Sequence, residues 1–127
     1  MKLVLALAAL TLFAGCGDDE GEAPGAGPPR FADLSVTVDD GNGPKTVQVR
    51  CDAASDSREC AALAEMKLKT FRPVPANVAC TQQYGGPETA SVKGTLRGEP
   101  VEARFSRVNG CEIARWNAAR ELLAATG

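Results

Sequence analysis

The chain has 127 residues, 44% of them hydrophobic, which is enough for one domain of ordinary size. It contains no histidine, which removes the usual general base, the commonest zinc ligand and every Ser-His or Cys-His nucleophile. The net charge is −2, but four of the 16 acidic and two of the 14 basic residues precede Phe31, which leaves 12 of each. A neutral domain gives no electrostatic reason to bind nucleic acid. We therefore expect no enzyme, no nucleic-acid partner and no cofactor.

Residues 1–15 have the pattern of a secretion signal. Lys2 is followed by an apolar run over residues 3–13, which is too short for a membrane span. The end of the run resembles the lipobox of bacterial lipoproteins, Leu12-Phe13-Ala14-Gly15-Cys16. We interpret Cys16 as the lipidated N-terminus of a secreted protein, anchored to the outer face of a bacterial cell membrane. The alternative is an ordinary secretory signal that contains a cysteine.

Residues 16–30 are predicted to be a disordered tether. They carry an acidic cluster and then several prolines and glycines, with no hydrophobic periodicity, so they cannot bury apolar surface. A single folded domain is expected over residues 31–127.

The first half of this domain is predicted to form a hairpin and a helix. Apolar residues alternate with polar ones over residues 34–38 and again over residues 47–51, on either side of a stretch rich in turn residues. Helix formers occupy residues 59–70, and Asp56 with Glu59 resembles a helix start. Pro73 is expected to end the helix.

The second half begins with an exposed loop at residues 78–84, where no helix or strand pattern is present. Alternation returns over residues 89–96 and 100–107, which predicts a second hairpin. Residues 111–125 favour a helix, with Ile113, Trp116 and Leu123 on one face. The predicted fold class is therefore α+β, an antiparallel sheet built from two hairpins with two helices.

The cysteines predict two disulfides. Lipidation of Cys16 leaves four cysteines, which can pair in three ways: Cys51, Cys60, Cys80 and Cys111. Sequential pairing would close one small loop and one of 32 residues, and the larger bridge would stabilise the fold by about 3–4 kcal/mol. No metal site is expected, because there is no Cys-x-x-Cys pair and no histidine.

Several short motifs follow one another along the domain. They are the strand Leu34-Ser35-Val36-Thr37-Val38, the strand ending in Cys51, Cys60-Ala61-Ala62-Leu63, Val78-Ala79-Cys80, Tyr84, the hairpin at residues 94–101, and the run at residues 104–112. Together they resemble the Streptomyces subtilisin inhibitor family of secreted serine protease inhibitors. The resemblance covers almost the whole domain and implies a subtilisin inhibitor-like fold with the sequential cysteine pairing.

The resemblance also implies a site. The family's primary specificity residue lies two positions after the third paired cysteine, which makes Gln82–Gln83 the reactive bond in this chain. The flanking residues would contact the protease: Val78, Cys80, Thr81 and Tyr84. The implied partner is an extracellular serine protease, subtilisin-like or trypsin-like. Because relatives commonly dimerise through the sheet, a homodimer is a further expectation.

The chain departs from the family pattern in several respects, two of which bear on the alternative function. Thr81 stands where the family usually has proline, and residues 111–125 favour a helix where the family ends in a strand. The alternative function is therefore a lipid-anchored cell-surface binding or structural module that keeps the inhibitor fold without inhibiting a protease.

Overall fold

The computed structural model of the chain describes residues 27–127. The predicted signal peptide (1–15), the predicted lipidation site Cys16 and most of the predicted tether lie outside the described residues. The tether was expected to extend to residue 30, but Arg30 is already the first residue of a strand.

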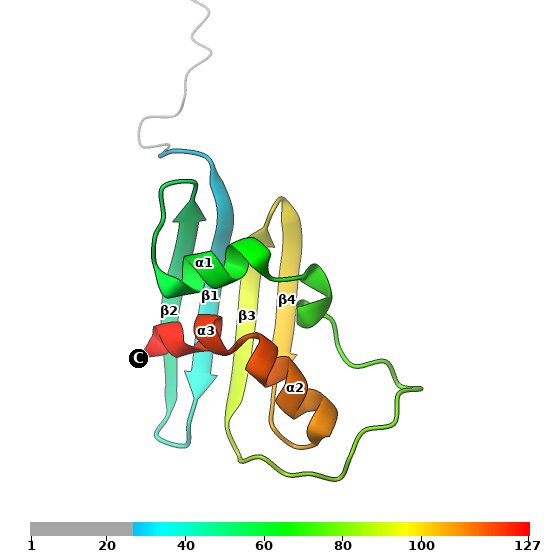
Figure 1. Cartoon of the computed structure of the whole chain (residues 1–127). Helices are drawn as coiled ribbons and strands as arrows, with labels where there is room; N and C mark the ends of the chain where they lie inside the picture. Colours follow the sequence, from blue (N-terminus) through cyan, green and yellow to red (C-terminus); the bar gives the residue numbers. More distant parts are fainter. Residues whose placement is uncertain (1–26) are drawn as a thin grey trace, which may run out of the picture.

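The described residues form an α+β fold around one antiparallel sheet. Its strands are β1 (Arg30–Asp39), β2 (Pro44–Asp52), β3 (Thr89–Leu96) and β4 (Glu99–Phe105), in the order β2-β1-β3-β4 (Figure 1). Both predicted hairpins are present as β1–β2 and β3–β4, and β1 joins them by pairing with β3. The predicted fold class and antiparallel sheet are confirmed.

The turns of the two hairpins follow from local chemistry. In the β1–β2 turn, the backbone N–H of Asn42 donates to a carboxylate oxygen of Asp40 at 3.0 Å and holds the pKa of that carboxyl below its usual value. In the β3–β4 turn, Arg97 and Gly98 have φ angles of 49° and 79°. Two consecutive residues with positive φ match the right-handed twist of the flanking strands.

The second strand of this hairpin is shorter than expected. The prediction extended it to Arg107, but β4 ends at Phe105. The physical reason is that the backbone carbonyl of Arg107 accepts a hydrogen bond from the N–H of Gly85, at 2.7 Å, so the chain has left the sheet there.

Three α-helices cover one face of the sheet: α1 (Arg58–Glu65), α2 (Gly110–Ala118) and α3 (Arg120–Leu123), with 3-10 turns at Leu68–Phe71 and Ala124–Thr126 (Figure 1). The core lies between these helices and the sheet. Its largest fully buried side chains come from both layers: Phe105, Leu34, Leu63, Leu96, Leu122, Val36, Val92 and Cys51. The opposite sheet face is polar, as the period-2 alternation predicts for an antiparallel sheet.

The prediction for the first helix was wrong at both ends. The helix was expected to run from residue 59 to residue 70, but α1 ends at Glu65 and a separate 3-10 turn follows. The start is capped by Ser57, whose hydroxyl accepts from the N–H of Cys60, rather than by Asp56.

A tertiary contact explains the early end of α1. The guanidinium of Arg97, on the β3–β4 turn, donates to the carbonyls of Leu63 at 2.8 Å and Met66 at 2.5 Å. These carbonyls at the helix end gain a charged partner, so the helix can stop without leaving them unsatisfied. The break also allows Phe71 to enter the core, where its ring packs edge-on against Phe105 with the centroids 6.3 Å apart.

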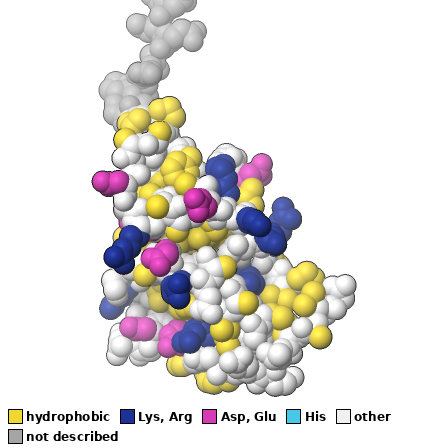
Figure 2. Space-filling view, viewed as in Figure 1, with side chains coloured by type: hydrophobic (Ala, Val, Ile, Leu, Met, Phe, Trp, Pro, Cys, Tyr) yellow, Lys and Arg dark blue, Asp and Glu magenta, His cyan; other side chains and the backbone are white. Residues whose placement is uncertain are grey.

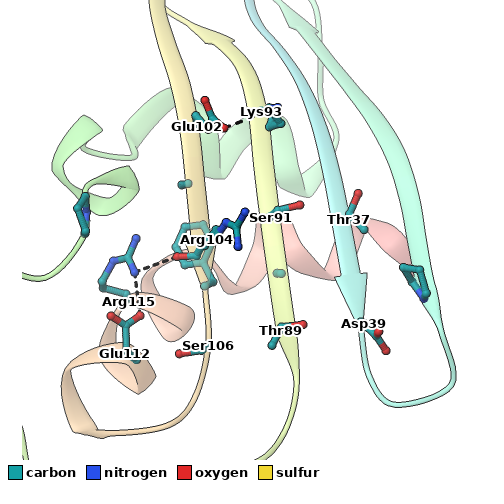
Figure 3. Close-up of a pocket in the computed structure, with 15 residues that line it drawn as sticks. Thr37, Asp39, Thr89, Ser91, Lys93, Glu102, Arg104, Ser106, Glu112 and Arg115 are labelled. Atoms are coloured by element: carbon teal, nitrogen blue, oxygen red, sulfur yellow. Dashed lines mark hydrogen bonds and ion pairs between the residues drawn. The ribbon is translucent and has the colours of Figure 1, made fainter.

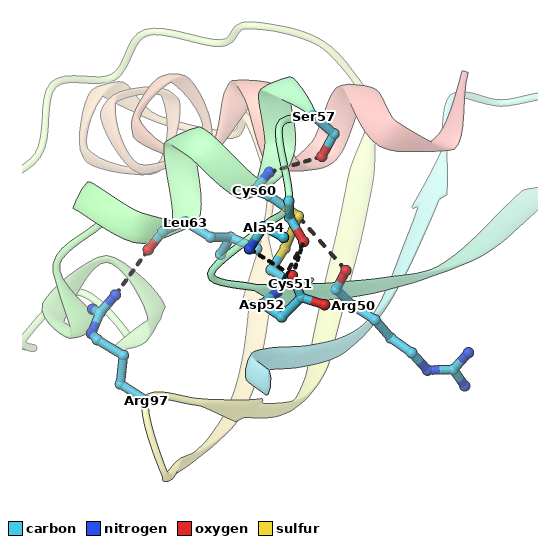
Figure 4. The surroundings of a disulfide bond; sticks show 9 residues. Arg50, Cys51, Asp52, Ala54, Ser57, Cys60, Leu63 and Arg97 are labelled. Atoms are coloured by element: carbon cyan, nitrogen blue, oxygen red, sulfur yellow. Dashed lines mark hydrogen bonds between the residues drawn. A yellow bond between two sulfur atoms is a disulfide. The ribbon is translucent and has the colours of Figure 1, made fainter. Parts of the chain in front are cut away.

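Both disulfides of the described residues follow the sequential pairing. Cys51 of β2 is bonded to Cys60 of α1, with Cα atoms 5.5 Å apart (Figure 4). Cys80 is bonded to Cys111 of α2, with Cα atoms 5.3 Å apart. The first bridge lies in the core, where Cys51 is fully buried, and the second lies beside the loop that follows Phe71.

The C-terminal segment is helical, as predicted, but it is divided. Ala119, with φ −99° and ψ 4°, separates α2 from α3 and is itself fully buried. After this break both Leu122 and Leu123 are buried in the core, whereas the predicted helix face contained only Leu123 of the two. The Ile113 side chain packs against the loop instead. Its Cδ1 atom lies so close to Gly85 that a Cβ on that glycine would be only 3.0 Å away.

Candidate functional site

The predicted reactive loop, residues 78–84, contains no helix or strand. Gln82 and Gln83 are exposed, and the flanking hydrophobic residues Val78 and Tyr84 are 47% and 65% exposed. The loop swings out beyond β4 and α2 before the chain returns to β3 (Figure 1). An exposed, irregular segment on an ordered scaffold is typical of a binding loop.

The arm before Gln82 is held by one covalent bond and one hydrogen bond. Cys80 is bonded to Cys111, and the backbone N–H of Gly110 donates to the carbonyl of Thr81 at 3.1 Å. Gly110 approaches so closely that a Cβ there would overlap the Thr81 hydroxyl and lie 3.3 Å from its Cβ. The absence of a side chain at Gly110 therefore makes this contact possible.

The arm after Gln83 is held by a hydrogen bond and an ion pair. The N–H of Gly85 donates to the carbonyl of Arg107 at 2.7 Å. The guanidinium of Arg107 pairs with the Glu88 carboxylate at 3.1 Å, with about a third of each side chain exposed (32% and 30%). Gly86 has a φ of +141° and lies against this pair, so a side chain there would collide with Glu88.

Both arms therefore rest on one short segment, residues 107–111, which we call the supporting segment. It continues directly into α2, whose start is fixed by Asn109: its side-chain oxygen accepts from the N–H of Glu112 at 3.0 Å. A rigid helix start thus holds the segment, and the segment holds the chain on both sides of the Gln82–Gln83 bond.

Sequence reasoning identified the loop and its disulfide but missed most of its support. Arg107, Gly110 and Glu88 had no predicted role. One local signal was available, since Asn109 followed three residues later by Glu112 is a typical helix start. The Arg107–Glu88 pair had no such signal, because the two residues are 19 positions apart.

A second feature of the surface is a groove of about 750 Å³ on the polar face of the sheet (Figure 3). Thr37, Ser91 and Arg104 are among its lining residues, and Lys93 of β3 pairs with Glu102 of the neighbouring strand β4 at 3.6 Å. At its end the guanidinium of Arg115 donates to the carbonyl of Arg104, pairs with Glu112 at 2.8 Å and lies 4.8 Å from the ring centre of Phe105. These contacts fix Arg115 at the β4 edge.

Metal-ligating side chains do not cluster within residues 27–127. No three acidic or cysteine side chains in that part of the chain come together as metal ligands. None of the helices described is both long enough and apolar enough to cross a membrane. The loop with its supporting segment is the best-defined candidate site in the described residues, because both arms of the loop are attached to residues 107–111.

Comparison with known proteins gives no family assignment. No model of a known protein family matches the chain, and no curated protein matches it. The resemblance to the subtilisin inhibitor family therefore depends on the motifs and their order along the chain.

Proposed function

We propose that this protein is a membrane-tethered inhibitor of secreted serine proteases with a subtilisin inhibitor-like fold. Its loop would lie in the protease cleft as a substrate does, with Gln82 in the primary pocket and Gln82–Gln83 as the reactive bond. The protease would be subtilisin-like or trypsin-like, and lipid on Cys16 would hold the domain at the outer face of a bacterial cell membrane.

One observation carries this proposal: the chain on both sides of the Gln82–Gln83 bond is attached to the same supporting segment. Thr81 and Cys80 are held on one side and Gly85 on the other. A substrate-like loop binds an enzyme as an added extended strand, with side chains in the enzyme's pockets. Because the scaffold already fixes both arms, little conformational entropy is lost on binding.

The same attachment favours inhibition over digestion. If the protease cuts Gln82–Gln83, the Thr81 side stays bound through Gly110 and the Cys80–Cys111 disulfide, and the other side stays bound through Gly85. The new amino group therefore remains beside the acyl group, and resealing of the bond competes with hydrolysis. No catalytic side chain of the inhibitor is required.

The second candidate is a lipid-anchored binding or structural module. The observation that favours it is the helical C-terminus: α2 and α3 stand where the resembled family has a strand. The polar sheet face with its groove would then be a binding surface, and a homodimer through this face remains a prediction.

Titration of the purified domain against subtilisin-like and trypsin-like proteases separates the two candidates. An inhibitor gives a stoichiometric loss of protease activity and slow cleavage at the single bond Gln82–Gln83, found by mass spectrometry of the complex. No effect on any protease, or rapid cleavage at several sites, would contradict the inhibitor proposal and leave the binding module.

A further inference from the structure

The exposed large hydrophobic side chains of residues 27–127 are Val78, Tyr84 and Val108, with 47%, 65% and 55% of their surface exposed. Val78 and Tyr84 belong to the loop, and Val108 belongs to the supporting segment. In the space-filling view, hydrophobic side chains also show over the loop side of the molecule (Figure 2). All three belong to the loop or to the segment that holds it, and exposed apolar side chains confined to one part of a surface indicate a site that a partner covers.

The hydrogen bonds place Val108 relative to the reactive bond. Thr81 is bonded to Gly110, and Gly85 is bonded to Arg107, so the loop and the supporting segment run antiparallel. Three loop residues, Gln82 to Tyr84, therefore lie opposite two residues of the segment, Val108 and Asn109. Tyr84 precedes Gly85 and Val108 follows Arg107, so both residues adjoin the Gly85–Arg107 hydrogen bond, which holds the part of the loop after the reactive bond.

The residues on either side of Val108 make contacts that stabilise the loop and the start of α2. Arg107 is ion-paired with Glu88, Asn109 caps α2, and Gly110 contacts Thr81. Val108 is the exposed side chain of the segment 107–110, while the other three residues are partly buried. Its apolar side chain is thus presented to solvent by a rigid backbone.

We propose that Val108 is a specificity-determining contact residue outside the loop. With Tyr84 it covers apolar surface of the protease on the side of the cleft that holds the residues after the cleaved bond. This inference rests on the proposed inhibition and adds a prediction about the target: its cleft is apolar on that side. A protease with a charged or narrow cleft there is rejected whatever side chain occupies position 82.

The test measures inhibition constants against the protease of the panel that the wild-type domain inhibits most strongly. Val108→Asp brings a charge onto the apolar contact and is expected to weaken inhibition by about tenfold or more, whereas Val108→Ile keeps it near wild type. Thr95→Asp, at an exposed β-branched residue of β3, is the matched control and leaves inhibition unchanged. Thermal midpoints of both Val108 variants stay close to wild type, because the altered side chain is exposed. Thr95→Asp places a carboxylate opposite Asp33 of β1, so its inhibition is measured at a temperature where this variant is folded.

A double-mutant cycle then tests whether Tyr84 and Val108 act on one surface. The effects of Tyr84→Ala and Val108→Ala on the inhibition constant are expected not to add, because both side chains contact the same patch. Val108→Ser replaces Val108→Asp if the aspartate variant does not fold. Unchanged inhibition by the Val108 variants of a protease that the wild type inhibits would overturn this inference alone. Failure of the wild type to inhibit any protease would overturn the proposed function and this inference with it.

Discussion

The backbone N–H of Gly110 donates to the carbonyl of Thr81 at 3.1 Å, across a contact that leaves no room for a side chain on Gly110. The two residues are 29 positions apart, yet they fix the chain immediately before Gln82. Gly110 is also the first residue of α2, so the loop is attached directly to a helix start.

The first prediction concerns this contact. Gly110→Ala should weaken protease inhibition about tenfold, because the new Cβ displaces Thr81. Thermal stability should stay the same or rise, because alanine favours a helix by up to about 1 kcal/mol over glycine. Opposite changes in inhibition and stability distinguish a positioning role from a general loss of structure.

The control for that substitution removes the obstructing hydroxyl. In a Thr81→Ala background, Gly110→Ala should have a smaller effect on the inhibition constant, because the atom closest to the new Cβ is gone. Equal effects of Gly110→Ala in both backgrounds would show that the Thr81 contact does not position the loop.

The second prediction concerns the primary specificity residue. Gln82→Leu should tighten inhibition of subtilisin-like proteases about tenfold or more, because an apolar side chain gains about 1.5–3 kcal/mol on burial. Gln82→Lys should shift the preference towards trypsin-like enzymes. Inhibition constants measured on both enzyme classes check this.

A matched control for Gln82 is available on the opposite edge of the sheet. Gln48 is an exposed glutamine of β2, and Gln48→Leu makes the same chemical change away from the loop. Its side-chain amide donates to the Asp33 carboxylate at 2.6 Å, so the comparison is made on inhibition constants of folded protein. Glu88 is unsuitable as a control, because it is ion-paired with the supporting residue Arg107. Folded Gln82 variants that leave all tested proteases unaffected would remove the loop from consideration as an inhibitory site.

The third prediction concerns the loop disulfide. Replacing Cys80 and Cys111 by alanine should lower the free energy of unfolding by about 3–4 kcal/mol and convert the inhibitor into a substrate, since the arm before the bond is released. Mass spectrometry after incubation with protease should then show rapid cleavage. The matched control replaces Cys51 and Cys60 by alanine. This variant should lose stability but, where it is folded, still resist cleavage at Gln82–Gln83. Equal cleavage of the two variants would contradict the prediction.

The fourth prediction concerns the fold. Arg97→Asn should lower the free energy of unfolding by about 1–3 kcal/mol, because the carbonyls of Leu63 and Met66 lose a charged donor. Asparagine tolerates the positive φ of residue 97, so the turn itself is kept. Urea denaturation measures the change. Arg72 is exposed, and Arg72→Asn is the control, which should change the free energy of unfolding by no more than about 0.5 kcal/mol. A similar loss of stability at both sites would argue against the contact.

The fifth prediction concerns the anchor. If Cys16 is lipidated, the protein should fractionate with membranes, and Cys16→Ser should release it or leave it unprocessed. A wild-type protein that is wholly soluble and carries a free Cys16 thiol would contradict the lipoprotein interpretation while leaving the proposals for the folded domain untouched.

The sequence by itself determined the two hairpins, the helical C-terminus and the exposed loop, because period-2 alternation, turn residues and helix formers act over short distances. It did not determine where α1 ends, since that depends on Arg97, 34 positions after Leu63. The tertiary structure alone decided that residues 107–111 hold both arms of the loop, and that Gly110 lies against Thr81. Such contacts join residues that are far apart in the chain. The local sequence around either residue does not indicate which distant residue it will contact.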